Sequence, residues 1–92
     1  MKVEEKNMKI LILTDGYHTS TCLTSHGARL HGVMELIDLL AQPHQTKFEV
    51  KVIGYEETDN YDAYERLDAG HFSEEDFNLL WGEAKSDCHW RI

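Results

Sequence analysis

The feature that most constrains the fold of this chain is an unbroken aliphatic run, Ile-Leu-Ile-Leu, at positions 10–13. Successive side chains of a strand point to opposite faces of a sheet, so a strand with one solvent-facing side alternates apolar and polar residues. A continuous apolar run of this length instead predicts a strand over residues 9–14 that is buried on both faces. The sheet that contains it is therefore expected to be covered on both sides.

A helix and a second strand are predicted to follow. Between positions 27 and 41 the apolar residues recur at helical spacing: Leu30, Val33, Met34, Ile37, Leu40 and Ala41. We expect Thr24 or Ser25 to cap this helix, and the proline of Gln42-Pro43 to end it. Residues 47–55 alternate as in a half-exposed strand, with three apolar side chains on one face: Phe48, Val50 and Val52. Strand, helix and strand in this order predict a βαβ-like unit.

The C-terminal half is predicted to contain two more helices. The first spans about residues 60–67 and ends at Ala69-Gly70. The second begins after Ser73, which has Asp76 three residues later as in a capping box. Its apolar stripe is Phe77, Leu80, Trp81 and Ala84. Residues 88–92 alternate and are expected to add an edge strand, whereas residues 1–7 are polar and are expected to be loose. The sequence thus predicts a small single α/β domain over residues 1–92, with a mixed sheet packed by two to three helices.

Composition narrows the setting of the protein. Apolar residues make up 41% of the chain, enough for one core, but no apolar run approaches the ~18 residues of a membrane span. The formal net charge is −8, and polyanions repel such a chain, so we expect it to bind neither free DNA nor a membrane. We expect a cytoplasmic protein in which Cys22 and Cys88 are free thiols.

The polar segment over residues 15–26 is the first candidate for chemistry. It is expected to be a loop between a buried strand and a helix, where α/β proteins often bind ligands, and it resembles the opening strand and loop of Rossmann-type glycosyltransferases. It lacks both G-x-G-x-x-G and the Lys-Ser/Thr of a P-loop. A polar loop whose hydroxyls satisfy its own backbone is the simpler interpretation.

Two further interpretations of this segment are weaker still. His18, Cys22 and His26 are spaced four apart, with Cys88 and His89 farther along, but the paired Cys-x-x-Cys of a strong zinc site is missing. Cys22 or Ser20 with His18 or His26 and Asp15 supplies the residue types of a catalytic triad. Nothing in the pattern places a nucleophile on a strained turn. We therefore expect no catalytic residue, no metal and no cofactor.

The distribution of charge is more informative. Residues 1–48 carry five acidic and five basic side chains, whereas residues 56–76, which we call the acidic segment, carry nine acidic side chains and one basic side chain, Arg66. The acidic segment therefore holds the whole net charge of −8. Charge that served solubility alone would not be expected to concentrate in this way. We predict that the acidic segment binds a basic partner through Glu56, Glu57, Asp59, Asp62, Glu65, Asp68, Glu74, Glu75 and Asp76.

Over its whole length the chain resembles the phage-encoded anti-CRISPR proteins of the type I-F class. The resemblance lies in MKILILTDGYHTSTCLTSHGARLHGVMELIDLL, in YDAYERLDAGHFSEEDF and in the tail CHWRI. It implies a non-enzymatic inhibitor in the host bacterial cytoplasm, which binds the RNA-guided surveillance complex and blocks target DNA binding. The implied partner surfaces are basic subunits of that ribonucleoprotein. A variant of this hypothesis, drawn from the charge distribution, is a contact to RNA through Arg29, Lys47 or Lys51. The choice of acidic site residues rests on the charge distribution alone and not on the resemblance.

Two alternatives remain open from the sequence. A small ligand-binding or hydrolytic domain would use the segment over residues 15–26. A DNA mimic would direct the same acidic segment against another basic host protein, such as a restriction enzyme.

Overall fold

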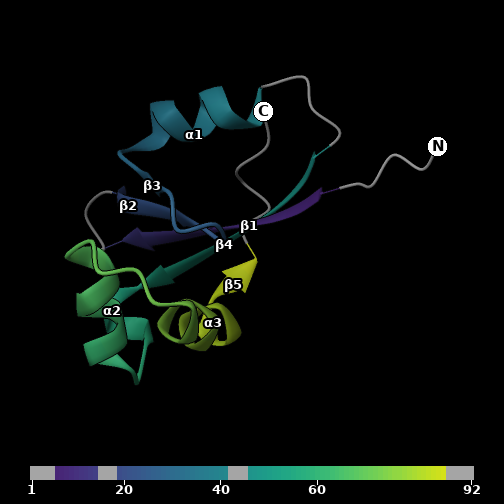
Figure 1. Ribbon diagram of the computed structural model, residues 1–92. Coiled ribbons are helices and arrows are strands. Elements are labelled where there is room, and N and C mark those ends of the chain that lie inside the picture. The colour runs from purple at the N-terminus through teal and green to yellow at the C-terminus, as the bar shows by residue number, and fades with distance from the viewer. Residues whose placement is uncertain (1–5, 15–18, 42–45, 87–92) are drawn as a thin grey trace.

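The computed structural model describes residues 6–14, 19–41 and 46–86 (Figure 1). Within this part of the chain, five strands form one mixed sheet in the order β3-β2-β1-β4-β5. The elements are β1 (Lys6–Thr14), β2 (Thr19–Thr24), β3 (Arg29–Leu30), α1 (Val33–Leu40), β4 (Thr46–Gly54), the short 3-10 helix η1 (Tyr55–Glu57), α2 (Tyr61–Asp68), α3 (Glu74–Glu83) and β5 (Lys85–Ser86). The predicted fold class, a small α/β domain with a mixed sheet packed by helices, is confirmed.

The sheet lies between two helical layers, with α1 on one face and α2 and α3 on the other (Figure 1). The central strand β1 contributes to both cores. Ile10 and Ile12 pack beneath α1 together with Cys22 and Leu36. Leu11 and Leu13 belong to the second core, where they join the buried side chains of α2 and α3: Ala63, Tyr64, Leu67, Phe77, Leu80 and Trp81. The aliphatic run at positions 10–13 is therefore buried on both faces, as predicted.

The pairing of β1 with β4 confirms the βαβ-like unit. The two strands are parallel neighbours in one register from Lys6 opposite Thr46 to Thr14 opposite Gly54. The chain between them includes α1, which covers the sheet face toward which Phe48, Val50 and Val52 also pack.

The prediction of a loop over residues 15–26 is wrong for residues 19–24. Residues 19–24 form β2, which pairs antiparallel with β1 so that Leu11 lies opposite Leu23. Threonine is β-branched and suits a pleated strand. The hydroxyls of Thr21 and Thr24, both buried, are hydrogen-bonded to Asp68 and to the Ala28 amide. Residues 15–18 lie outside the described part of the chain.

The helix predicted over residues 27–41 is shorter than expected. It begins at Val33, because the preceding residues form β3, which pairs with β2. Gly27 and Gly32 have φ values of 81° and 87°, outside the right-handed helical region. Thr24 therefore lies in a strand that leads into a turn, and neither Thr24 nor Ser25 caps the helix. Gly32 occupies the N-cap position without a side-chain hydrogen bond.

The two C-terminal helices follow their predicted boundaries closely. After α2 the chain turns at Gly70, whose φ is 95°, and the amide of His71 donates to the Arg66 carbonyl at 2.9 Å. At the start of α3 the Ser73 hydroxyl accepts from the amide of Asp76 at 3.5 Å, which is the predicted cap. Both ends are thus set by local chemistry that the sequence displays.

The ends of the chain are described only in part. Residues 1–7 were expected to be loose, but β1 already begins at Lys6. The edge strand predicted over residues 88–92 lies outside the described residues, and so does Cys88. A two-residue strand, β5, precedes that segment and pairs with Lys51 and Val52 of β4. None of the helices in the described ranges is long and apolar enough to cross a membrane.

Candidate docking surface

The acidic segment runs through η1, α2 and the first turn of α3, all on the same side of the sheet (Figure 1). Eight of its nine acidic residues are exposed, but they are not equivalent, because some already bind other parts of the protein. The described contacts separate the carboxylates that hold the fold from those that remain accessible.

Asp76 belongs to the structural group. Its carboxylate accepts two hydrogen bonds from one guanidinium, from Arg66 Nε at 2.8 Å and from Arg66 Nη2 at 2.9 Å. This pair links α2 to α3 and holds the pKa of Asp76 below its usual range. Only 8% of Asp76 is exposed. Asp76 is therefore a structural ion-pair partner that has little exposed surface to offer another molecule, unlike the other predicted partner-binding residues.

Three further acidic residues are engaged at the surface. Asp68 accepts a hydrogen bond from the Thr21 hydroxyl at 3.0 Å, and its backbone carbonyl accepts one from Arg29 Nη2 at 2.8 Å. These contacts attach the end of α2 to β2 and β3. Glu65 accepts from the Tyr55 hydroxyl at 3.2 Å, and Glu57 lies 3.7 Å from Lys85 Nζ. A partner would compete with these interactions.

The other carboxylates are exposed and make no hydrogen bond or ion pair with the described part of the chain. They belong to Glu56, Asp59, Asp62, Glu74 and Glu75. Glu74 and Glu75 lie in the first turn of α3, where the helix dipole stabilises negative charge. Asp62 lies in the first turn of α2, where the helix dipole stabilises its charge in the same way, whereas Asp59 precedes the N-cap Asn60. All five carboxylates remain accessible to a partner.

A pair of exposed tyrosines lies beside these carboxylates. The rings of Tyr55 and Tyr61 are 5.2 Å apart between centroids, and 37% and 47% of the two residues is exposed. Tyr55 also packs edge-on against Tyr64, which is buried and donates its hydroxyl proton to the Thr14 carbonyl at 2.9 Å. Exposed tyrosines are common anchors in protein interfaces. The sequence prediction rested on charge and did not select them, although Tyr55, Tyr61 and Tyr64 lie in or next to the acidic segment.

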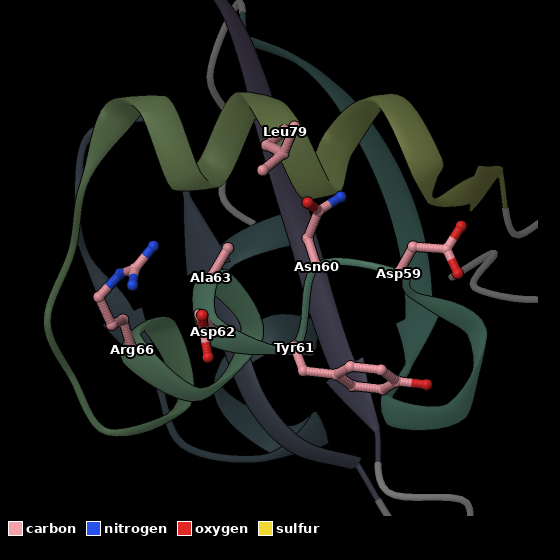
Figure 2. Close-up of a pocket in the computed structure, with 7 residues that line it drawn as sticks. All are labelled: Asp59, Asn60, Tyr61, Asp62, Ala63, Arg66 and Leu79. Carbon is pink, nitrogen blue, oxygen red and sulfur yellow. The ribbon is translucent and has the colours of Figure 1, made fainter.

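A pocket of about 330 Å³ lies between α2 and α3 (Figure 2). Its lining consists of Asp59, Asn60, Tyr61, Asp62, Ala63, Arg66 and Leu79. Leu79 comes from α3 and lies across the pocket from Ala63, while Arg66 and Asp59 lie at opposite ends (Figure 2). The pocket therefore combines two unengaged carboxylates with an aromatic ring and an aliphatic side chain.

Glu83 holds the turn that forms one end of this pocket. Its carboxylate accepts hydrogen bonds from the Thr58 hydroxyl at 2.7 Å, from Asn60 Nδ2 at 2.8 Å and from the amide of Asp59 at 3.1 Å. These donors favour the ionised form and hold the pKa of Glu83 below its ordinary value of 4.5. The turn before α2 is thus fixed to the end of α3.

This arrangement predicts a pH-dependent stability. Because the folded-state pKa of Glu83 is lowered, its contribution is complete above about pH 4.5 and is lost as the pH falls through the lower folded value. We expect Glu83→Gln to reduce the free energy of unfolding at pH 7 by about 1 kcal/mol, after allowance for solvent screening. The difference from wild type should shrink at pH 2–3, as measured by urea unfolding. Glu49→Gln, which changes an exposed carboxylate on β4 with no described hydrogen bond and no helix dipole beside it, should change stability little at either pH.

The alternative site over residues 15–26 is partly described. Cys22 is fully buried beneath α1, and burial raises its pKa to about 11, so the thiol stays protonated at neutral pH. It is therefore a core residue and a poor nucleophile or metal ligand. His26 is exposed, and Ser20 lies in β2. Four other candidates lie outside the described residues: Asp15, His18, Cys88 and His89. No group of three or more potential metal ligands occurs within the described ranges.

Comparison of the chain with protein-family models, with curated proteins and with solved structures finds no significant match.

Proposed function

We propose that this protein is a non-enzymatic binding protein that docks its acidic segment onto a basic macromolecular surface. The observation that carries the proposal is the concentration of the entire net charge of −8 in residues 56–76, with the carboxylates of Asp59 and Asp62 exposed and unengaged. Asp62 lies in the first turn of α2, with Asp59 just before its N-cap, and Glu74 and Glu75 begin α3. The fold therefore displays fixed negative charge on regular elements.

The physical consequence is electrostatic steering. A cluster of like charges raises the rate of encounter with an oppositely charged surface, and salt weakens this effect because the Debye length falls to about 8 Å at physiological ionic strength. Charge at the rim of an interface mainly sets the association rate and the choice of partner. The exposed rings of Tyr55 and Tyr61 supply the contact area that charge alone does not.

For the partner we propose the type I-F CRISPR surveillance complex in the host bacterial cytoplasm, supported by the resemblance to anti-CRISPR proteins. Effectors of this kind hold guide RNA and target DNA in positively charged channels. An acidic protein bound in such a channel excludes target DNA by occupancy and needs no chemical step. The proposed activity is therefore inhibition of DNA binding.

The test is a gel-shift competition. Purified type I-F surveillance complex is incubated with the protein and then with a labelled target duplex, at about 50 mM and about 300 mM salt. We expect loss of the shifted band at low salt and weaker inhibition at high salt. A band that persists at low salt, with excess protein that does not copurify with the complex, would contradict the choice of partner.

A lysate pull-down separates the partner from the mode of binding. Recovery of a different basic protein, released by salt, would retain the acidic docking surface and replace the partner. Recovery that is insensitive to salt would contradict the acidic docking surface itself.

A further inference from the structure

The pocket between α2 and α3 has a composition that selects among basic groups. Arg66 is the one cationic side chain in its lining, and its guanidinium is already paired with Asp76 through two hydrogen bonds. Asp59 and Asp62 accept no hydrogen bond from a cationic side chain in the described part of the chain, although Asp62 is close enough to Arg66 to favour its charged form. The lining residues carry a net charge of −1, which becomes −2 when Asp76, the carboxylate outside the lining that pairs with Arg66, is included.

This charge balance disfavours anionic ligands. A phosphate or a carboxylate at Arg66 would reach only the donors that Asp76 leaves free, and it would face the carboxylates of Asp59, Asp62 and Asp76. A cationic group meets the reverse situation, because it gains Asp59 and Asp62 and leaves the Arg66–Asp76 pair intact. The local charge therefore favours a cation.

The size and the walls favour an amino-acid side chain. The volume of about 330 Å³ lies at the lower end of the range for small-molecule sites, roughly 300–1,000 Å³. One wall carries the exposed Leu79 side chain, and Tyr61 extends from the start of α2 away from Ala63 and Arg66, on the side where Asp59 lies (Figure 2). Apolar and aromatic walls suit the aliphatic stem and flat guanidinium of arginine, which is more weakly hydrated than the ammonium of lysine.

We propose that this pocket binds an arginine side chain presented by the protein partner, with Asp62 and Asp59 as the counter-charges and Tyr61 as the stacking surface. The inference rests on the proposed function, because it names the group that anchors a basic partner on the acidic segment. It assigns a specific residue type, arginine, to the partner's side of a contact that charge alone would leave non-specific.

The pocket can be tested without the partner. The ¹⁵N-labelled protein is titrated with Nα-acetyl-arginine methylamide, and the backbone amide shifts are followed by NMR. Nα-acetyl-citrulline methylamide is the matched ligand control, since it has nearly the same shape without the charge, and sodium chloride equalises the ionic strength. We expect arginine to shift the amides of Asn60, Asp62 and Leu79 with an affinity at least threefold higher than that of citrulline. The lysine analogue should fall between the two.

Variants of the protein separate the pocket from general electrostatics. Asp62→Asn should weaken arginine binding at least threefold, and Tyr61→Ala should reduce the preference for arginine over lysine. Asp38→Asn removes a charge from α1, on the opposite side of the sheet, and should leave both unchanged. Equal shifts with arginine and citrulline, or arginine shifts confined to Glu74 and Glu75, would overturn the pocket assignment. Neither result alters the gel-shift outcome, so the two proposals fail separately.

Discussion

Replacing Leu80 by alanine is expected to lower the free energy of unfolding by about 2–5 kcal/mol. Leu80 is fully buried in the core that β1 shares with α2 and α3. Its truncation removes apolar contacts and leaves a cavity that neighbouring side chains fill only in part. For a domain of this size a loss of 1 kcal/mol corresponds to about 4–8 °C in Tm, so the melting temperature should fall by at least about 8 °C.

The adjacent residue provides a matched control. Leu79 lies on the same helix and undergoes the same chemical change when replaced by alanine, but 47% of it is exposed and it faces the pocket. We expect Leu79→Ala to change the free energy of unfolding by about 0.5 kcal/mol or less. Urea unfolding of both variants is the measurement. Similar losses for the two would contradict the orientation of α3 on the sheet.

This pair of leucines illustrates what the sequence can predict. The helical period assigned Leu80 to the buried stripe without any knowledge of the fold, and Ser73 with Asp76 gave the start of the helix. The aliphatic run in β1 likewise required two covered sheet faces, and the structure has them. In each case the signal is local, because periodicity and caps depend on residues within one or two turns.

The strand β2 shows where local signals fail. Its six residues, TSTCLT, are mostly polar and read as a loop. The polar side chains are tolerated because their partners come from elsewhere: the Thr21 hydroxyl donates to Asp68, forty-seven residues away in the sequence. No pattern within residues 19–24 reveals that partner. The strand was therefore missed for a non-local reason.

The candidate site also has a part that the sequence predicts and a part that only the packed structure reveals. Charge composition located the acidic segment, since counting residues needs no structure. It could not show that the carboxylate of Asp76 is paired with Arg66, or that Asp68 binds Thr21 of β2. These contacts form only when the helices pack on each other and on the sheet. It also gave no weight to Tyr61, whose importance depends on its exposure beside Asp59 and Asp62.

The distinction between engaged and unengaged carboxylates defines the second large effect. We expect the double variant Asp59→Lys with Asp62→Lys to weaken binding to the basic partner at least tenfold at physiological salt. Neither side chain makes a described hydrogen bond, although Asp62 lies in the first turn of α2 and near Arg66, so the fold of the variant is compared with that of the wild type by circular dichroism. A tenfold loss corresponds to about 1.4 kcal/mol, which is within reach of two reversed charges at an interface rim. Reversing Asp68 is avoided, because it would also break the contact with Thr21.

A control of equal charge tests whether position matters. Asp38→Lys with Glu49→Lys changes the net charge by the same amount, but these exposed residues lie on α1 and β4, outside the acidic segment. If only net charge steers association, both double variants should lose affinity equally at each salt concentration. If the acidic segment is the docking surface, the loss should be confined to the Asp59 and Asp62 variant. Gel-shift competition with the surveillance complex, after circular dichroism has confirmed that both variants fold, distinguishes a local docking surface from a diffuse field.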